Sequence, residues 1–318
     1  MGIKFLNQFL RDQCNNSIAK INIADLTNKK IAIDTSIYLY KYESTDTLLE
    51  NMYLMLSIFR HYNITPVFIF DGKPPPEKKE LLKKRQEDKT AAKNEYNKLK
   101  EQMDLNQLTD EDKQEIIVSM DQLKKQFVYI TYEKIEKVKE LIRAYGATYY
   151  DAPGEADELC ALLVNTNKVW ACLSEDMDLF VYGCKRVLRY ISLNNHSVVL
   201  YYTKGILNEL NICQKEFREI CVLSGTDYNI NVNVLNLYDI IKLFREYQLN
   251  KLNHTFYDWL KLNLNLNLNI DLLQKINSMF IISNELTLSF KNIHILNSSI
   301  NKELIKTIMK EDGFLFIN

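Results

Sequence analysis

Acidic side chains follow several short apolar runs in this sequence. The run KKIAIDTS carries Asp34, PVFIFDG carries Asp71, and VWACLSEDMD carries both Asp176 and Asp178. The carboxyl ends of parallel strands meet at one edge of an open α/β sheet, where active sites lie. A single Asp at a strand end is usually a helix cap. Several together predict a functional site at that edge.

Carboxylates this crowded need a cation, because like charges a few ångströms apart raise one another's pKa. None of the four histidines, His61, His196, His254 and His294, is adjacent to these acids. Ligands that are all oxygen favour Mg²⁺ or Mn²⁺ over zinc. Two such ions, roughly 4 Å apart, would clamp the attacking and leaving oxygens in a displacement at phosphorus. Positioned acid–base groups alone supply only about 10²- to 10⁴-fold acceleration, so metals are favoured.

Other chemistries have no local support in the sequence. We find no Ser/His/Asp or Cys/His arrangement, no GxxxxGK[ST] loop and no GxGxxG. The six cysteines never approach CxxC spacing, which argues against a disulfide framework or a zinc site. The N-terminus is not typical of a secretory signal, and no run of about 18 apolar residues occurs. The expected location is therefore intracellular, in nucleus or cytoplasm, including a viral replication compartment.

The order of apolar runs and amphipathic segments predicts an α/β fold with a doubly wound, mostly parallel sheet flanked by helices. A helix is expected over residues 133–146, with Gly146 as its C-cap, and another over about 155–165. Residues 187–202 are expected to form a hairpin that turns at Asn194 and Asn195.

Residues 73–132 interrupt this pattern. Residues 73–101 contain ten Lys or Arg against six Asp or Glu. Thr109 and Asp112 resemble a capping box that opens a second helix. We expect a helical insertion, basic in its first half, although the pattern is also that of a solvated charged helix pair. Further on, LNLNLNLNI at 262–270 alternates like a strand, or is low-complexity sequence; both interpretations stay open.

Taken together, the motifs resemble the flap endonuclease family, the XPG-type 5′ nucleases. The matching segments are MGIKFL, IAIDTSIYLY, VFIFDGKPPPEKKELLKKR, DAPGEADELCALL, LSEDMDLFVYG and LSGTDYN, in family order over residues 1 to about 245, with a weaker echo at 301–309. The resemblance implies a PIN-like fold. It also implies a metal-binding set made of Asp34, Asp71, Glu155, Asp157, Asp176, Asp178 and Asp227.

The resemblance further implies activity, cofactor and partner. The activity would be two-metal hydrolysis of DNA phosphodiesters by a flap endonuclease or 5′–3′ exonuclease in replication, repair or recombination, with two Mg²⁺ ions that Mn²⁺ can replace. The partner would be DNA with a 5′ flap, nick, gap or junction. The protein would act as a monomer and would not associate with a membrane. The catalytic residues would be Lys78, Arg85, Asp34, Asp71, Glu155 and Asp176. The DNA-binding residues would be Gly2, Tyr40, Lys78, Lys83, Lys84 and Arg85.

The chain departs from the family pattern in several places. The segment from Asp34 to Asp71 is shorter, and that from Arg85 to Thr131 is longer. The family's glycine-rich helix-two-turn-helix is replaced by NINVNVLNLYDII, with Val234 and Asn236 at glycine positions, which predicts a degenerate element and weaker duplex binding. No sliding-clamp peptide is recognisable.

Two domains are expected on this basis. Residues 1–228 would form the nuclease core with a helical arch at about 86–132, and residues 229–318 would form the degenerate element and a helical C-terminal region. Glu158, at i+3 from Glu155, is a further candidate beside the metal-binding set.

Two other functions compete with the nuclease hypothesis. One is an RNA 5′ exonuclease, whose family also opens with Met-Gly and uses an acid cluster. The other is a catalytically silent protein that binds DNA structures. Retention of all seven acids favours catalysis over the silent alternative.

Overall fold

The computed structural model describes residues 2–103, 110–229, 235–250, 255–264 and 268–316. Packing divides the chain into two units that interleave along the sequence. Unit 1 comprises Met1–Thr35, Ile58–Pro74 and Thr148–Asn297, and unit 2 comprises Ser36–Ser57, Pro75–Ala147 and Ser298–Asn318. This division rests on packing and does not test the expected boundary after residue 228, which stays a prediction.

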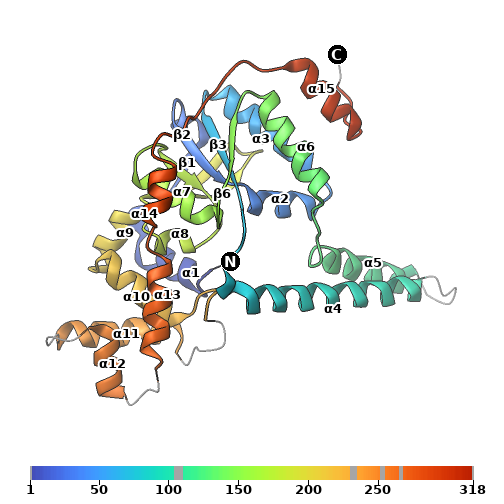
Figure 1. The fold of residues 1–318 in the computed structure, drawn as a ribbon. Helices are drawn as coiled ribbons and strands as arrows, with labels where there is room; N and C mark the ends of the chain where they lie inside the picture. The colour runs from blue at the N-terminus through green and yellow to red at the C-terminus, as the bar shows by residue number, and fades with distance from the viewer. Residues whose placement is uncertain (1, 104–109, 230–234, 251–254, 265–267, 317–318) are drawn as a thin grey trace. The chain divides into compact units, whose positions relative to one another are not determined.

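Unit 1 contains a seven-stranded sheet in the order β1-β7-β6-β5-β2-β3-β4 (Figure 1). Neighbours from β6 to β4 run parallel, whereas β7 runs antiparallel to both β6 and β1. The predicted mostly parallel α/β sheet is therefore confirmed. The strands are β1 (Ile18–Asn22), β2 (Lys30–Asp34), β3 (Thr65–Phe70), β4 (Thr148–Asp151), β5 (Ala171–Leu173), β6 (Arg186–Ser192) and β7 (Ser197–Tyr202).

The central strands are short apolar runs because both of their faces are covered. Ile31, Ala32 and Ile33 of β2 are all buried, as are the three residues of β5. Such continuous apolar runs are typical of parallel strands. The helix α7 (Ala156–Asn165) contacts β2, β3 and β5. The predicted strands and helix of this region are confirmed, although β5 is shorter than its apolar run.

The antiparallel end of the sheet is less visible in the sequence. The β6–β7 hairpin turns between Ser192 and Ser197, which includes the expected turn residues. The strand β1 pairs with β7 over its whole length but was not predicted. Its five residues, IAKIN, are exposed or half-buried, so they lack an apolar face of the usual kind.

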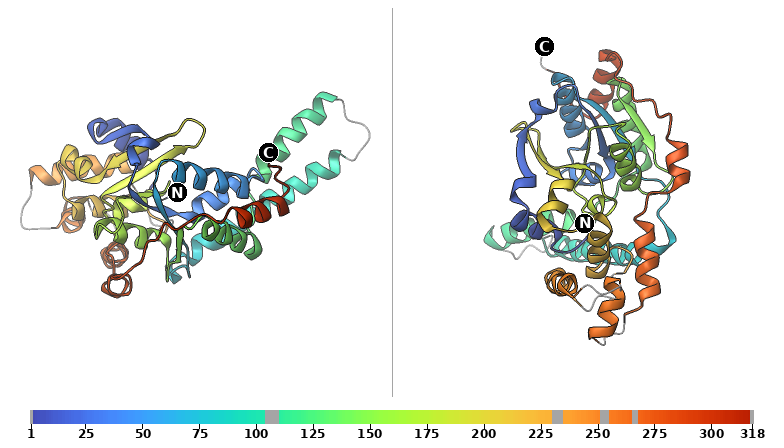
Figure 2. Two further views of the ribbon diagram at one scale, coloured as in Figure 1. Left: turned by 90° about the horizontal axis from the view of Figure 1, so that it is seen from above. Right: turned by 90° about the vertical axis from the view of Figure 1, so that its left-hand side faces the viewer.

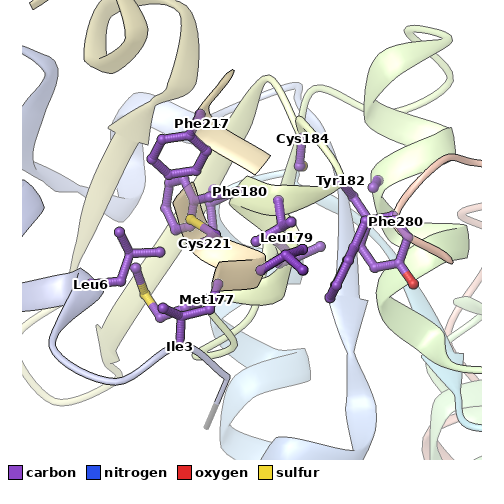
Figure 3. Packing of buried hydrophobic residues seen from close by; sticks show 14 of the residues in the cluster. Ile3, Leu6, Met177, Leu179, Phe180, Tyr182, Cys184, Phe217, Cys221 and Phe280 are labelled. Atoms are coloured by element: carbon purple, nitrogen blue, oxygen red, sulfur yellow. The ribbon is translucent and has the colours of Figure 1, made fainter. Parts of the chain in front are cut away.

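Helices of unit 1 contribute to a buried cluster that joins the chain's N-terminal segment to its later helices. Ile3 and Leu6 belong to this cluster together with Met177, Phe180 and Cys221 (Figure 3). The remaining helices of this unit are α1 (Leu6–Gln13), α8 (Asp178–Val181), α9 (Thr203–Leu210), α10 (Gln214–Ser224), α11 (Leu237–Leu249), α12 (Phe256–Leu264), α13 (Ile270–Met279) and α14 (Asn284–Ser289). Short 3-10 turns occur at Asn15–Ser17 and Ile23–Leu26.

Two expectations for the later part of the chain have different outcomes. Part of the segment expected to form the degenerate element is helical, with Ile240 and, further along, Phe244 buried in α11. The strand interpretation of 262–270 is wrong for its described part, since residues 262–264 end α12 and Ile270 begins α13. The buried residues of α12 are Phe256, Tyr257, Trp259 and Leu260, and the helix extends from them into this exposed stretch. Val234, at one expected glycine position, lies outside the described residues.

Unit 2 is helical among its described residues. The long helix α4 (Lys79–Met103) and α5 (Asp110–Lys124) lie side by side, as Figures 1 and 2 show. The expected helical insertion is confirmed, while Thr109 of the expected capping box lies outside the described residues. The unit also holds α6 (Tyr132–Ala144), α15 (Lys302–Glu311), most of α2 (Thr35–Glu43) and α3 (Leu48–His61), and the 3-10 turn η3 (Pro76–Lys78).

The ends of α6 follow the expected capping chemistry. The Thr131 hydroxyl accepts a hydrogen bond from the Lys134 N–H at the start of the helix. Gly146, just beyond its end, has φ +69, and a Cβ there would lie 2.5 Å from the carbonyl oxygen of Ser298. The predicted terminating glycine is therefore needed for both conformation and space. No described helix is long and apolar enough to cross a membrane.

A close approach between backbones after β3 generates a first prediction. The Gly72 N–H donates to the Gly154 carbonyl at 2.7 Å, and a Cβ on Gly72 would lie 1.9 Å from the carbonyl oxygen of Ala152. Gly72→Ala should therefore lower the free energy of unfolding by roughly 1–3 kcal/mol, as overpacking does. Urea denaturation measures the change.

Gly154→Ala is the matched control, because a Cβ at that position would meet nothing within 4 Å. Equal unfolding curves for the two alanine variants would contradict the steric explanation.

Candidate metal and phosphodiester site

Asp34 closes β2 with a carboxyl group that is only 4% exposed. The Ser174 hydroxyl donates to its Oδ2 at 2.8 Å, and a hydrogen bond joins its side chain to that of Asp157. Burial and the nearby charges of Asp71 and Asp176 raise the pKa of Asp34 to about 8, against the lowering effect of those hydrogen bonds. A buried carboxylate among other carboxylates is thus the starting feature of the site.

Asp157, in the first turn of α7, lies within the electrostatic reach of four other acids. Burial, followed by the charges of Asp176, Asp34, Asp178 and Asp71, raises its pKa well above the usual range. Its Oδ1 is buried and has no hydrogen-bond partner among the described residues. A buried polar atom of this kind needs a partner, and the described part of the chain does not provide one.

The segment between β5 and α8 supplies two further acids. The Asp176 N–H donates to Ser174 Oγ at 3.0 Å, and the Asp178 N–H donates to Asp176 Oδ1 at 3.0 Å. Gly2 approaches this segment from the N-terminus: it has φ +77, and a Cβ there would lie 2.6 Å from Asp178 Oδ1 and 2.7 Å from Asp176 Oδ1. Only glycine fits at position 2 without displacing these carboxylates.

Asp71 is exposed, and its Oδ1 accepts a hydrogen bond from the Ala156 N–H at 2.8 Å. That N–H belongs to the first residue of α7, so Asp71 stabilises the amino end of this helix. Asp71 therefore does two things: it caps a helix, as an Asp at a strand end usually does, and it belongs to the acid group.

Glu155 is the N-cap residue of α7, and its Oε2 accepts a hydrogen bond from the Tyr228 hydroxyl at 2.6 Å. Asp227, next to that tyrosine, is buried in the turn after α10. The contacts described above connect five acids directly: Asp34, Asp71, Asp157, Asp176 and Asp178. Glu155 is linked to these five acids through Tyr228, because its charge and that of Asp178 both act on the Tyr228 hydroxyl. The contacts described above do not include Asp227. Glu158 contacts another element, accepting the Ser283 N–H at 3.0 Å.

Sequence reasoning missed the neutral residues that hold these acids. Ser174 binds both Asp34 and the Asp176 backbone, and Tyr228 binds Glu155. The signal was present, because each of these residues is adjacent to a predicted acid or within two positions of one. Hydroxyl groups beside carboxylates were not considered as donors.

The donor set fits a hard divalent cation. Its candidate ligand atoms are all carboxylate oxygens, and Asp157 Oδ1 is buried without a hydrogen-bond partner among the described residues. Among the residues that the structure describes, however, no three Asp, Glu, His or Cys side chains are arranged closely enough to ligate one ion. Rotation of carboxylates would have to accompany metal binding.

The predicted DNA-contacting residues other than Gly2 belong to unit 2. Tyr40 of α2 is 48% exposed, and Lys78 is buried at the end of η3. On α4, Lys83 and Lys84 are exposed and Arg85 is half-buried. These residues are thus placed on η3, α2 and α4, while their contacts with DNA stay predictions.

Lys89, one helical turn beyond Arg85, was not predicted. Its Nζ lies 5.0 Å from the ring centroids of both Tyr40 and Tyr129, and it donates to the Val128 carbonyl at 2.9 Å. Such cation–π contacts favour a fixed position of the cation over an aromatic face. The i, i+4 spacing from Arg85 was the available signal.

The fold and the acid group define an α/β protein with a carboxylate site at the carboxyl edge of its parallel strands. Residues 1–92 match the XPG N-terminal domain, and residues 146–227 match the XPG I-region. All seven predicted metal ligands fall inside these two ranges.

Relatives extend the match beyond the two domains. Flap endonuclease 1-A of Sorghum bicolor is 31% identical over 269 residues, covering 78% of this chain and 67% of the relative. Flap endonuclease 1-B of Oryza sativa subsp. indica is 30% identical over 266 residues, covering 78% of this chain and 62% of the relative. The chain belongs to the flap endonuclease family of XPG-type nucleases. It spans 62% of the length of the rice relative.

Solved structures support the same fold. The catalytic core of Rad2 in complex with DNA substrate aligns with a TM-score of 0.65 at 20% identity, over 95% of this chain and 93% of that one. The Holliday junction-resolving enzyme GEN1, in complex with product DNA and Mg²⁺, aligns with a TM-score of 0.64 at 17% identity, over 98% and 73%.

The crowding around Asp34 generates a second prediction. Asp34→Asn removes one buried charge, and its amide can still accept from Ser174 while donating to Asp157. The folded-state pKa of Asp34 lies above its unfolded value, so its ionisation destabilises the metal-free fold progressively from about pH 4 to about pH 8. With chelator present, the variant should melt at a higher temperature than wild type at pH 8, and the difference should vanish near pH 4.

Differential scanning calorimetry across this pH range measures the effect. Asp12→Asn, which alters an exposed acid on α1, is the control. Its melting temperature should equal that of wild type at every pH in this range. A lower melting temperature for Asp34→Asn in chelator at pH 8 would be incompatible with charge crowding.

Proposed function

We propose that this chain is a metal-dependent, structure-specific 5′ nuclease that hydrolyses DNA phosphodiesters at 5′ flaps or other branched or nicked DNA. The observation that carries the proposal is the group of buried carboxylates at the carboxyl ends of β2 and β5 and the start of α7, in a chain of this family. Replication, repair or recombination would supply such DNA. An intracellular location, nucleus or cytoplasm, is part of the proposal.

The metal would be two Mg²⁺ ions, replaceable by Mn²⁺. The proposed ligands are Asp34, Asp71, Glu155, Asp157, Asp176, Asp178 and Asp227. When bound, the ions would activate water and stabilise the charge that develops on the oxygens around phosphorus. GEN1, a structural relative of this chain, carries Mg²⁺ with product DNA. The oxygen-only donor set and the orphaned Asp157 Oδ1 support the assignment in this chain.

The chain's own residues would then handle the substrate. Lys78 and Arg85 would hold the scissile phosphate, and Lys83 and Lys84 would contact neighbouring phosphates, as cations attract the backbone without reading sequence. Tyr40, with its exposed ring, would stack on a base near the cut. Gly2, placed against Asp176 and Asp178, would leave room for the substrate backbone beside them.

The preferred DNA structure distinguishes the candidates within the family. Relatives are named as flap endonucleases, and structural relatives include a Holliday junction-resolving enzyme. A substrate panel separates these possibilities: labelled 5′ flap, nicked, gapped, single-stranded, four-way-junction and RNA substrates, each with Mg²⁺, with Mn²⁺ and with chelator. We expect cleavage of branched DNA with either metal and none with chelator.

Asp176→Asn should lower the cleavage rate by about 10²-fold or more, because it removes a charged oxygen from the proposed metal ligands. Asp271→Asn on α13 alters an exposed acid outside the group and should cut at the wild-type rate. Cleavage of no DNA, or an Asp176→Asn rate equal to wild type, would contradict the nuclease proposal. Preferred cleavage of RNA would instead indicate an RNA 5′ exonuclease, and tight DNA binding without cleavage would indicate a silent DNA-structure-binding protein.

Arg85→Ala tests the role of α4. If Arg85 stabilises charge that develops on the phosphate, its loss should reduce the single-turnover rate much more than the affinity for DNA. Fluorescence anisotropy with Ca²⁺ in place of Mg²⁺ measures the affinity. Lys93→Ala, also exposed on α4, is the control for general loss of charge. Equal losses in rate and affinity for Arg85→Ala would refute this role.

A further inference from the structure

A buried arginine lies behind the acid group in the middle of β6. Arg189 is only 5% exposed, and its guanidinium group stands against the rings of Tyr201 and Tyr190, with centroid distances of 5.6 and 4.9 Å. No predicted site residue contacts it through these interactions, and the proposed mechanism does not use it. Burying a guanidinium group is costly unless its donors are well paired.

The first partner of Arg189 is Glu175, the residue immediately before Asp176. Arg189 Nη2 donates to the Glu175 carbonyl at 2.8 Å and lies 3.7 Å from its carboxylate Oε2. The other carboxylate oxygen accepts the Tyr190 N–H at 2.7 Å. The main chain and the side chain of Glu175 are therefore both attached to β6. Asp176 is the next residue along the chain, so the same contacts also restrict its position.

The second partner is Asn7 of α1. Arg189 Nη1 donates to Asn7 Oδ1, which also accepts the Tyr201 hydroxyl at 2.9 Å. The Asn7 amide donates to the Tyr190 hydroxyl at 2.9 Å. This attachment fixes the helix that follows Gly2, whose backbone lies against Asp176 and Asp178. One guanidinium group thus joins the two segments that meet at these carboxylates.

The backbone of β6 is adapted to this connection. Tyr190 has φ +55, an uncommon conformation for a residue with a side chain, and the β6–β7 pairing is irregular between Arg189 and Ser192. At this bulge the Tyr190 N–H donates to the Glu175 carboxylate instead of pairing with β7. Bulges recur beside active sites, where they re-aim groups. Strain of this kind persists only where the surroundings impose it.

We propose that Arg189 is a positioning residue that holds the Glu175–Asp178 segment and the Gly2 segment in register, and so sets the affinity of the acid group for divalent metal. The inference rests on the proposed function in taking Mg²⁺ as that metal. Arg189 acts through Glu175 and Asn7 and does not touch metal or DNA. The planar fork of arginine is required, because a lysine ammonium cannot reach two partners in opposite directions with the same geometry.

The test measures metal binding without DNA. Wild type, Arg189→Gln and Arg189→Lys are titrated with Mg²⁺, and the rise in melting temperature gives the half-saturating concentration. Groups that orient metal ligands change metal affinity by about 10- to 100-fold. We expect both variants to need at least about tenfold more Mg²⁺ than wild type. We also expect DNA affinity in Ca²⁺ to be unchanged, and cleavage by Arg189→Lys to recover at saturating Mg²⁺.

Arg186→Gln is the matched control, at the first residue of the same strand. The Arg186 Nε donates to the Trp170 carbonyl at 2.6 Å, and its guanidinium group lies 5.0 Å from the Trp170 ring centroid. This variant should lose stability without a change in half-saturating Mg²⁺. Equal Mg²⁺ shifts for the Arg186 and Arg189 variants, or a wild-type response of the Arg189 variants, would overturn the inference.

Glu175→Gln gives a second measurement should Arg189→Gln fail to fold. Its amide oxygen can still accept from the Tyr190 N–H, while the charge that faces Arg189 is lost. The half-saturating Mg²⁺ should rise several-fold, and an unchanged value would overturn the inference. Wild type that is stabilised by Mg²⁺ but cuts no substrate would refute the nuclease proposal and leave the positioning role testable. Wild type without any Mg²⁺ response would refute both.

Discussion

Mutual repulsion among buried carboxylates is the constraint on which the rest of this structure depends. Asp34, Asp157, Asp176 and Asp178 are all nearly inaccessible to water, and the raised pKa values of Asp34 and Asp157 express the resulting cost. The chain answers with neutral donors: a serine hydroxyl and backbone N–H groups at the starts of α7 and α8. These donors reduce the repulsion without cancelling the charge. The fold thus maintains a volume lined with carboxyl groups, whose full ionisation a cation from outside the chain would favour.

The parts predicted correctly from the sequence are those in which one short segment carries the whole signal. Apolar runs followed by acids identified β2, β3 and the loop after β5, because continuous burial and a polar strand end are local properties. The same logic identified α6, whose cap and terminating glycine are adjacent to it in sequence. The family motifs then added Glu155, Asp157 and Asp227, which strand patterns alone do not single out, and their role as metal ligands stays a prediction.

The parts that were missed depend on pairs of residues far apart along the chain. Asn7 meets Arg189 across 182 positions, and β1 meets β7 across a similar separation. Neither Asn7 nor the IAKIN strand has a pattern that distinguishes it from a surface segment. Lys89 was missed for the same reason, since its aromatic neighbours come from two separate segments. The alternation at 262–264 left a strand open as one interpretation, but these residues continue a helix that is held by the packing of Phe256, Trp259 and Leu260 before them.

The pairing of β1 with β7 has a consequence for how the molecule is made. Residues 18–22 are synthesised long before their partners, residues 197–201. During that interval β1 has no ladder, and the early chain must remain soluble without it; its exposed lysine and asparagine side chains suit this requirement. Closing so long a loop is slow compared with local contacts. The contacts of Arg189 that join α1 to the Glu175–Asp178 segment can therefore form only after residue 189 has been synthesised.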